Sequence, residues 1–327
     1  MNYIEIQHGI SEEYGAYPKV KQAGLQKSKW ALWKKQRQLL LMALPFVSVV
    51  VFSYGPLWGW LMAFKKYSIV KGLLDSPWVG LYQFRKLFQD DEFYQVLRNT
   101  LAMSAMSLIF GFVCAIGLAL LLNEVRLMLF KRTIQTITYL PHFVSMVVVA
   151  SIVTVMLSPD HGLLNDLLIW MGIIDEPIFY LSKGNWYWVI NTLVGLWKEV
   201  GWSSIIYLAV LSGISPELYE AAEVDGASRF SKMWHISIPG IMPTAMILLI
   251  LATGSLINSG YEMQMLLGNN LTIEYSQVLD LYALNYAFKL GDYSYGAAIS
   301  IFKSVVSVTL VLIVNAISKR MGQSRVI

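Results

Sequence analysis

Two charged residues and two tryptophans lie within six residues of one apolar stretch, at Trp197, Lys198, Glu199 and Trp202. An ionisable side chain inside such a stretch is costly unless it faces a cavity or a partner. Lys198 and Glu199 are direct neighbours, so on a helix they point about 100° apart and do not face each other. Aromatic faces beside polar groups suit the binding of sugar rings. The pattern predicts that this segment, with Asn191 two turns earlier, lines a path for a substrate.

A second polar and aromatic cluster closes a later apolar stretch, and one lysine lies inside the last stretch: Asn258, Tyr261, Glu262, Gln264 and Lys303. The alternative for each residue is a structural hydrogen bond or ion pair between helices. With an acidic cargo, Lys198 or Lys303 could offset a carboxylate. Equally, Glu199 or Glu262 could neutralise either lysine.

Helices in a membrane must position these residues. The chain has 327 residues, of which 56% are hydrophobic and 14% are charged, whereas a soluble domain carries about a quarter charged residues. A stretch of about 20 apolar residues spans a bilayer, and in lipid it must be helical. Six stretches are long enough, at 39–63, 98–122, 134–158, 187–212, 239–263 and 295–318. The sequence predicts an all-α polytopic membrane protein with six transmembrane helices.

The distribution of Lys and Arg predicts the orientation. With the N-terminus in the cytoplasm, the inner segments carry fifteen of these residues and the outer segments eight. An excess on the inner side is typical of cytoplasmic loops. We therefore expect both termini to be cytoplasmic, with a basic N-terminal segment at 1–38, a first transmembrane helix and outer loop at 39–94, and a tail at 319–327.

A loop at 215–239 separates the fourth and fifth stretches and has the pattern helix, glycine, helix. Ser215-Pro216-Glu217 is typical of a helix start, with Ser215 as the cap. Gly226 permits a left-handed or sharply bent backbone. A second helix is expected over 227–236, ending before Pro239. The result is a tight elbow between two short helices on the cytoplasmic side.

This loop reads Glu220-Ala221-Ala222, three residues, Gly226, nine residues, then Ile236-Ser237-Ile238-Pro239. The spacing resembles the EAA loop of binding-protein-dependent ABC importers at every fixed position except Ile238, where leucine is usual. The resemblance implies a type I ABC importer permease fold, with the permease core at 95–318. It also implies that the loop couples the chain to a separate ATPase, through Glu220, Ala221, Ala222, Asp225, Gly226 and Pro239.

The same resemblance implies the partners: a second homologous permease, two ATPase subunits and an extracytoplasmic solute-binding protein. The chain would lie in the bacterial cytoplasmic (inner) membrane among lipids and would bind no nucleic acid. The sequence lacks the Gly-x4-Gly-Lys-Ser/Thr phosphate loop. ATP and Mg are therefore expected on the ATPase, with no cofactor on this chain.

Three segments are similar to permeases for oligosaccharides of the aldouronate and alginate group, at Tyr139–His142, Asn285–Phe288 and Gly291–Gly296. This resemblance implies an oligosaccharide cargo, with an acidic one as an option. The alternative is the same machinery importing a neutral sugar or a lipoprotein- or peptide-like solute.

Two other classes of protein fit less well. A membrane-embedded enzyme needs a nucleophile with a base, or a metal site, and the Ser and His residues form no such pattern. An ion-coupled transporter would need no coupling loop and would usually show related halves. Cys114 is a lone cysteine in an apolar stretch, as expected of a buried apolar side chain. No catalytic residue and no metal ligand is predicted.

Overall fold

The computed structural model describes residues 29–258 and 260–320, and every regular element within these residues is helical. Five of the described helices are long and apolar enough to cross a membrane: Gln36–Phe64, Asp91–Glu124, Gly184–Ser212, Arg229–Gly254 and Tyr293–Ile317. The helix pair Met128–Phe143 and Met146–Met156 is the sixth candidate. The predicted all-α architecture is confirmed. The tail residues 321–327 and most of the predicted N-terminal segment, 1–28, lie outside the described residues.

The chain divides into two units, residues 1–58 and 59–327. In the first unit, helix α2 (Lys29–Val49) continues into the π-helical η1 (Val50–Tyr54). The helix then tightens into the 3-10 helix η2 (Gly55–Phe64), whose second half belongs to the second unit. Pro56 lacks an amide hydrogen, so the regular α-helical bonding pattern cannot continue unchanged through this point.

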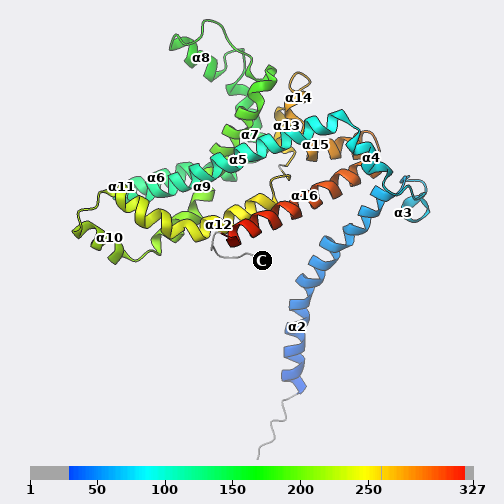
Figure 1. Ribbon diagram of the computed structural model, residues 1–327, viewed down its shortest axis with the longest axis horizontal. Coiled ribbons are helices and arrows are strands. Elements are labelled where there is room, and N and C mark those ends of the chain that lie inside the picture. The colour runs from blue at the N-terminus through cyan, green and yellow to red at the C-terminus, as the bar shows by residue number, and fades with distance from the viewer. Residues whose placement is uncertain (1–28, 259, 321–327) are drawn as a thin grey trace, which may run out of the picture. The chain divides into compact units, whose positions relative to one another are not determined.

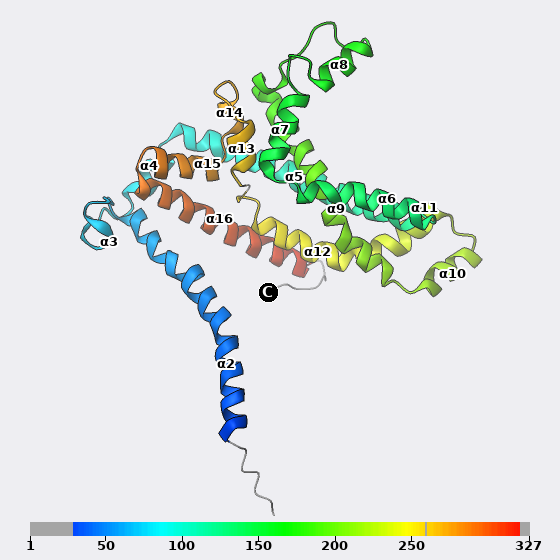
Figure 2. The same ribbon diagram turned by 180° about the vertical axis from the view of Figure 1, so that it is seen from behind.

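Four long helices form the frame of the second unit: α5 (Asp91–Glu124), α9 (Gly184–Ser212), α12 (Ile238–Gly254) and α16 (Tyr293–Arg320). Figures 1 and 2 show α5 running along α9, and α12 running along α16. Small residues allow close packing where three of these helices meet, as in the buried cluster of Ala115, Ala119, Tyr207, Leu211, Ile241 and Ala245.

Shorter helices connect and flank this frame. On the outer side, by the predicted orientation, they are α3 (Gly72–Asp75), α4 (Tyr82–Phe88), α8 (Leu163–Trp170), η4 (Tyr180–Ser182), α13 (Glu262–Leu267), α14 (Ile273–Ser276), α15 (Leu279–Leu284) and η6 (Asn285–Lys289). At the opposite end lie α10 (Pro216–Val224), α11 (Arg229–Lys232) and the π-helical η5 (Met233–Ser237).

The third predicted span is not one continuous helix. Helix α6 (Met128–Tyr139) passes into the 3-10 helix η3 (Leu140–Phe143), and α7 (Met146–Met156) starts after a bend of 104°. Pro141 cannot donate a backbone hydrogen bond, and Ser145 starts the new helix by accepting from the amide of Val148. The prediction of a single helix over 134–158 is therefore wrong at this break.

The fifth span differs from its prediction at both ends. Its helix runs unbroken through α11, η5 and α12, from Arg229 to Gly254. Pro239 is near the start of α12 and does not end the second loop helix, so that prediction is wrong. The π-helical stretch immediately before Pro239 changes the hydrogen-bond register and accommodates the missing amide. The helix ends at Gly254, so the predicted boundary at 263 is also wrong.

A buried tyrosine–carboxylate network joins the start of α5 to α15 and α16. The Asp90 carboxylate accepts hydrogen bonds from the hydroxyls of Tyr282 and Tyr295, at 2.6 and 2.9 Å. Burial raises the pKa of Tyr282, and its hydrogen bond to Asp90 raises it further, so the phenol remains a neutral donor. Nearby, Lys86 pairs with Asp292 at 3.0 Å. The segment Gly291–Gly296 therefore holds helices together in this chain.

Candidate functional site: a cavity and a coupling loop

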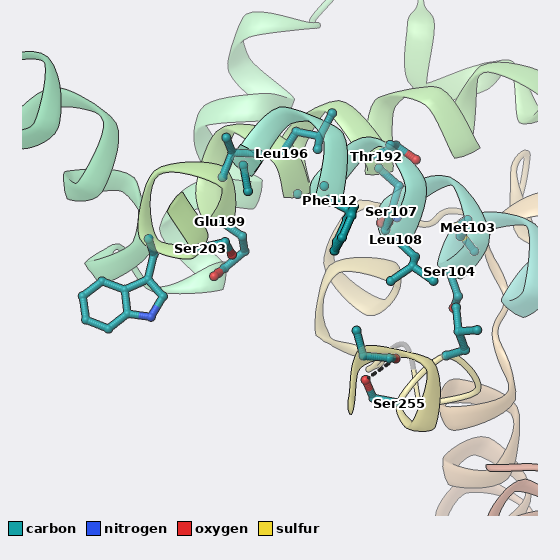
Figure 3. Close-up of a pocket in the computed structure, with 18 of the residues that line it drawn as sticks. Met103, Ser104, Ser107, Leu108, Phe112, Thr192, Leu196, Glu199, Ser203 and Ser255 are labelled. Carbon is teal, nitrogen blue, oxygen red and sulfur yellow. Dashed lines mark hydrogen bonds between the residues drawn. The ribbon is translucent and has the colours of Figure 1, made fainter. Parts of the chain in front are cut away.

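A cavity of about 560 Å³ opens between α5, α9, α12 and the start of α13. Its volume is within the range of small-molecule sites, about 300–1,000 Å³. The wall is mainly apolar, with hydroxyl and amide groups distributed along it, from Ser104, Ser107, Asn191, Thr192, Ser203, Ser255 and Gln264. Figure 3 shows five of the hydroxyl groups, on α5 (Ser104 and Ser107), on α9 (Thr192 and Ser203) and in the turn after α12 (Ser255). Glu199 is the one charged side chain among the described residues of this wall.

The cavity face of α9 follows helical spacing. Asn191, Gly195 and Glu199 lie four residues apart and therefore share a face, and Trp202 continues it. Gln264 donates to the Asn191 side-chain oxygen at 3.3 Å, which joins α9 to α13 across the cavity. Trp197 is half exposed but does not line the cavity. The structure therefore brings Asn191, Glu199 and Trp202 together and leaves Trp197 outside.

Lys198 points to the helix break and away from the cavity. Its ammonium group donates to the backbone oxygen of His142 at 2.7 Å and lies 3.4 Å from Glu199. Carbonyls at a helix break lack intrahelical donors, so a cation there satisfies one of them. Lys198 is only 8% exposed, which is compatible with a charge because both contacts compensate it.

Glu199 and Trp202 meet the ring of His142 from two sides. The Glu199 carboxylate lies 2.8 Å from His142 Nδ1, and the Trp202 ring stacks on the imidazole at 4.5 Å, nearly parallel. Gly201 allows α9 to lie close to the end of α6, because a Cβ at that position would lie 1.9 Å from the backbone oxygen of Thr138. The cavity wall and the break in the third span are therefore in direct contact.

The loop at the other end of α9 has the predicted elbow. Gly226 has a φ of +76°, which is the left-handed region that glycine tolerates best. The amides of Gly226 and Ala227 donate to the carbonyls of Glu223 and Ala222, at 3.1 and 2.8 Å. This is a Schellman motif that ends α10. Ser215 occupies the cap position as predicted, but its side chain makes no capping bond.

The elbow is attached to the fifth span, and Glu223 of α10 also pairs with Lys232 of α11 at 3.6 Å. The Tyr219 hydroxyl lies 2.9 Å from the Ser237 hydroxyl, which ties α10 to η5. Glu220, Ala221 and Asp225 are exposed, and Ala222 is partly buried. An exposed helix with small side chains can fit into a groove on a partner protein.

The sequence matches the family described as binding-protein-dependent transport system inner membrane component, over residues 107–323. The chain belongs to this family. A polygalacturonan/rhamnogalacturonan transport system permease protein of Bacillus subtilis is 41% identical over 290 residues, which cover 88% of this chain and 90% of the relative. The resemblance to ABC importers drawn from the coupling loop and the resemblance to oligosaccharide permeases drawn from three other segments are therefore confirmed, and the chain is a permease subunit and not an enzyme.

Solved structures confirm the type I importer permease fold of this permease. A chain of a bacterial ABC transporter that imports the acidic polysaccharide alginate has 38% identity and a TM-score of 0.80, covering 88% of this chain and 98% of that chain. The bacterial alginate ABC transporter in complex with an alginate pentasaccharide-bound periplasmic protein has 37% identity and a TM-score of 0.82. That match covers 91% of this chain and 99% of that chain.

Of the second predicted cluster, Gln264 lines the cavity of this permease, whereas Asn258, Tyr261 and Glu262 do not. These three are exposed, between the end of α12 and the first residue of α13. Lys303 is buried in α16 and forms an ion pair with Asp280 of α15. The option that Glu262 neutralises Lys303 is therefore wrong, because Asp280 takes that place.

Sequence reasoning missed the contribution of α5 to the cavity. Ser104, Ser107, Gly111 and Ala115 line the wall at spacings of three and four residues. These small residues share one helical face. The sequence did contain this stripe of small and polar residues within an otherwise apolar helix. Such a stripe is also a common sign of close helix packing.

Proposed function

We propose that this permease forms the translocation path for an oligosaccharide, and that the cargo passes through the cavity between α5, α9 and α12. One observation carries the proposal: three aromatic rings, a carboxylate and several hydroxyl and amide groups converge on one cavity of about 560 Å³. Hydroxyl-rich rings present both apolar faces and hydrogen-bonding edges, which such a wall complements. The sugar-transport functions named for its relatives support the same class of cargo.

The coupling loop would transmit the work of an ATPase to this cavity. Helix α9 lines the cavity with Asn191, Glu199 and Trp202, and three residues separate its end from the start of α10. The unbroken helix Arg229–Gly254 leaves the elbow and lines the cavity with Leu248 and Ala252. A displacement of α10 would therefore move both cavity walls, and the contacts expected to receive it are Glu220, Ala221, Ala222, Asp225, Gly226 and Pro239.

The proposed assembly contains a second homologous permease, two ATPase subunits that hold ATP and Mg, and an extracytoplasmic binding protein. Both termini of this chain would lie in the cytoplasm, on the same side as the coupling loop. The excess of Lys and Arg in the inner segments supports this orientation.

The charges near the cavity bear on whether the cargo is acidic. No lysine or arginine lies among the described residues of the wall, and both buried lysines already have carboxylate partners. An acidic oligosaccharide would therefore find its counter-charge on another chain of the assembly, such as the second permease. A neutral sugar would need no such contribution.

Uptake measurements on the assembled transporter test the coupling role. Gly226→Val forces a β-branched residue into a left-handed backbone, although a Cβ added at Gly226 would meet no atom within 4 Å. We expect more than about tenfold lower uptake for Gly226→Val, and near-normal uptake for Gly226→Asn, because asparagine tolerates this backbone. Normal uptake by Gly226→Val with intact ATPase binding would remove the mechanical role of the elbow.

Labelling of introduced cysteines tests the orientation. Glu223 and Lys183 are both exposed, and Cys114 is the one native cysteine, so a Cys114→Ser background is free of other thiols. A membrane-impermeant thiol reagent applied from outside should label Lys183→Cys and spare Glu223→Cys. The reverse pattern would place the coupling loop on the wrong side for an ATPase.

A further inference from the structure

Glu199 belongs to two structures at once. Its side chain is 49% exposed and lines the cavity, where a dissolved molecule can reach it. The same carboxylate binds the contact at the helix break, with Oε2 at 2.8 Å from His142 Nδ1 and Oε1 at 3.4 Å from Lys198 Nζ. Any ligand group that binds Glu199 therefore acts on a residue that also holds the break.

Side chains of α9 contribute to the geometry of that break. The backbone between η3 and α7 is not helical at Val144, and Pro141 has no amide hydrogen to donate. The bend of 104° is instead supported from α9, by the Lys198 bond to the His142 carbonyl and by the Glu199 contact to the His142 ring. A bend supported by side chains can change when one of those side chains is released.

The helix on one side of the break runs toward the coupling end of the permease. Helix α6 packs along α9, and both Figure 1 and Figure 2 show it extending from the break toward α11. A change at the break therefore has a direct route to the region of the coupling loop.

We propose that Glu199 is a cargo-responsive latch, whose carboxylate holds the η3–α7 break through His142 in the empty cavity and is drawn away when the hydroxyl groups of an oligosaccharide bind it. The latch consists of Glu199, His142 and Lys198. The inference rests on the proposed function, because it takes the cavity as the place where cargo binds. The latch adds that binding of cargo to Glu199 weakens its contact with His142 at the break, so that cargo binding and the movement of α6 are linked.

Two substitutions at His142 separate the latch from the aromatic stack. His142→Phe keeps a ring that can stack on Trp202 and removes the nitrogen that contacts Glu199. His142→Asn keeps a polar group that can reach Glu199 and removes the ring. Tyr139→Phe is the matched control, since it removes a polar group three residues away that lies outside the latch.

The experiment uses the full assembly in lipid, with spin labels on Ile137→Cys of α6 and Val155→Cys of α7 in a Cys114→Ser background. Both positions are exposed, at 65% and 69%. The distance between the labels and the ATPase rate are recorded with the binding protein empty, or loaded with an alginate pentasaccharide or with maltopentaose as a neutral counterpart.

The latch predicts that His142→Phe has, without cargo, the distance distribution that the unsubstituted permease shows only with cargo. Its cargo-free ATPase rate should rise about two- to fivefold, in keeping with the loss of one partly exposed polar contact. His142→Asn and Tyr139→Phe should keep the cargo dependence. If instead His142→Asn lost the cargo dependence and His142→Phe kept it, the stacking of His142 on Trp202 would be what holds the break. That result would overturn the latch.

The failure of the latch and the failure of the proposed function give different results. If uptake of either sugar is intact and His142→Phe keeps a normal cargo dependence, the latch is wrong and the cavity proposal stands. If neither sugar changes the rate or the distance in the unsubstituted permease, the cavity proposal is contradicted. The latch is then overturned with it, since it requires a response to cargo.

Discussion

Lys198 and Lys303 show two ways of keeping a charge inside a membrane helix. Both lysines are 8% exposed, and both contact a carboxylate. The partner of Lys303 is Asp280, whose side chain is only 21% exposed, whereas the partner of Lys198 is Glu199, which is 49% exposed and faces the cavity. One pair is enclosed by α15 and α16, and the other opens to solvent.

The difference separates a structural pair from one that a ligand can reach. An enclosed pair contributes by avoiding an uncompensated charge, and nothing in the cavity can compete for it. An open pair exchanges partners at little cost, because water and ligand hydroxyl groups replace each other around the exposed carboxylate. Burial of a lysine alone therefore does not identify a substrate contact, and the exposure of its partner is the useful criterion.

Breaking the enclosed pair should have the largest effect on stability. Lys303→Met leaves the mostly buried Asp280 without its cation, and we expect a loss of about 3 kcal/mol in the free energy of unfolding. The double variant Lys303→Met/Asp280→Asn removes both charges and should recover most of that loss. Thermal unfolding of the purified assembly measures this, and equal stability of the single and double variants would contradict the enclosed-pair account.

The two tryptophans of α9 sharpen the comparison between cavity and exterior. Trp202 lines the cavity and Trp197 does not, although both are about half exposed. Trp202→Ala should lower oligosaccharide uptake about tenfold, which corresponds to about 1.4 kcal/mol of lost cargo contact. Trp197→Ala should lower uptake less than about twofold at equal assembly with the ATPase. A larger loss of uptake for Trp197→Ala than for Trp202→Ala would show that the substrate path lies on the other face of α9.

Replacing Lys198, the lysine of the open pair, should have the smallest effect of these three sets of substitutions. The sequence left open whether Lys198 offsets a carboxylate of the cargo, and its ammonium group is already engaged by His142 and Glu199. Lys198→Met should therefore reduce uptake of uronate and neutral oligosaccharides by the same factor, about two- to fivefold. A selective loss of uronate uptake would show that Lys198 contacts the cargo after all.

The coupling loop was predictable from sequence because its geometry is local. A left-handed backbone needs glycine, a Schellman motif uses neighbours in the chain, and both follow from the residues around Gly226. Pro239 was the exception, since a π-helical stretch just before it lets the helix continue into α12, and no local pattern indicated that stretch. The ends of the first, fourth and sixth spans were likewise predicted to within three residues.

The cavity was less predictable because distant segments build it. The α9 cluster was visible as charges in an apolar run, yet which of its side chains face the cavity depends on α5, α12 and the broken span. His142 contacts Glu199 across 57 positions of sequence, and Asp280 meets Lys303 through the packing of α15 on α16. The aromatic segment near Asp292 suggested a substrate class, and in the structure it joins helices.

Filling the cavity is the most direct test of the central claim that cargo passes between α5, α9 and α12. Gly111 and Gly117 both lie in α5 with no atom within 4 Å of an added Cβ, but only Gly111 lines the cavity. Uptake of uronate and neutral oligosaccharides is measured for Gly111→Trp and Gly117→Trp at equal assembly with the ATPase. The account predicts at least about tenfold lower uptake for Gly111→Trp and near-normal uptake for Gly117→Trp. Normal uptake by Gly111→Trp, or an equal loss in both variants, would contradict it.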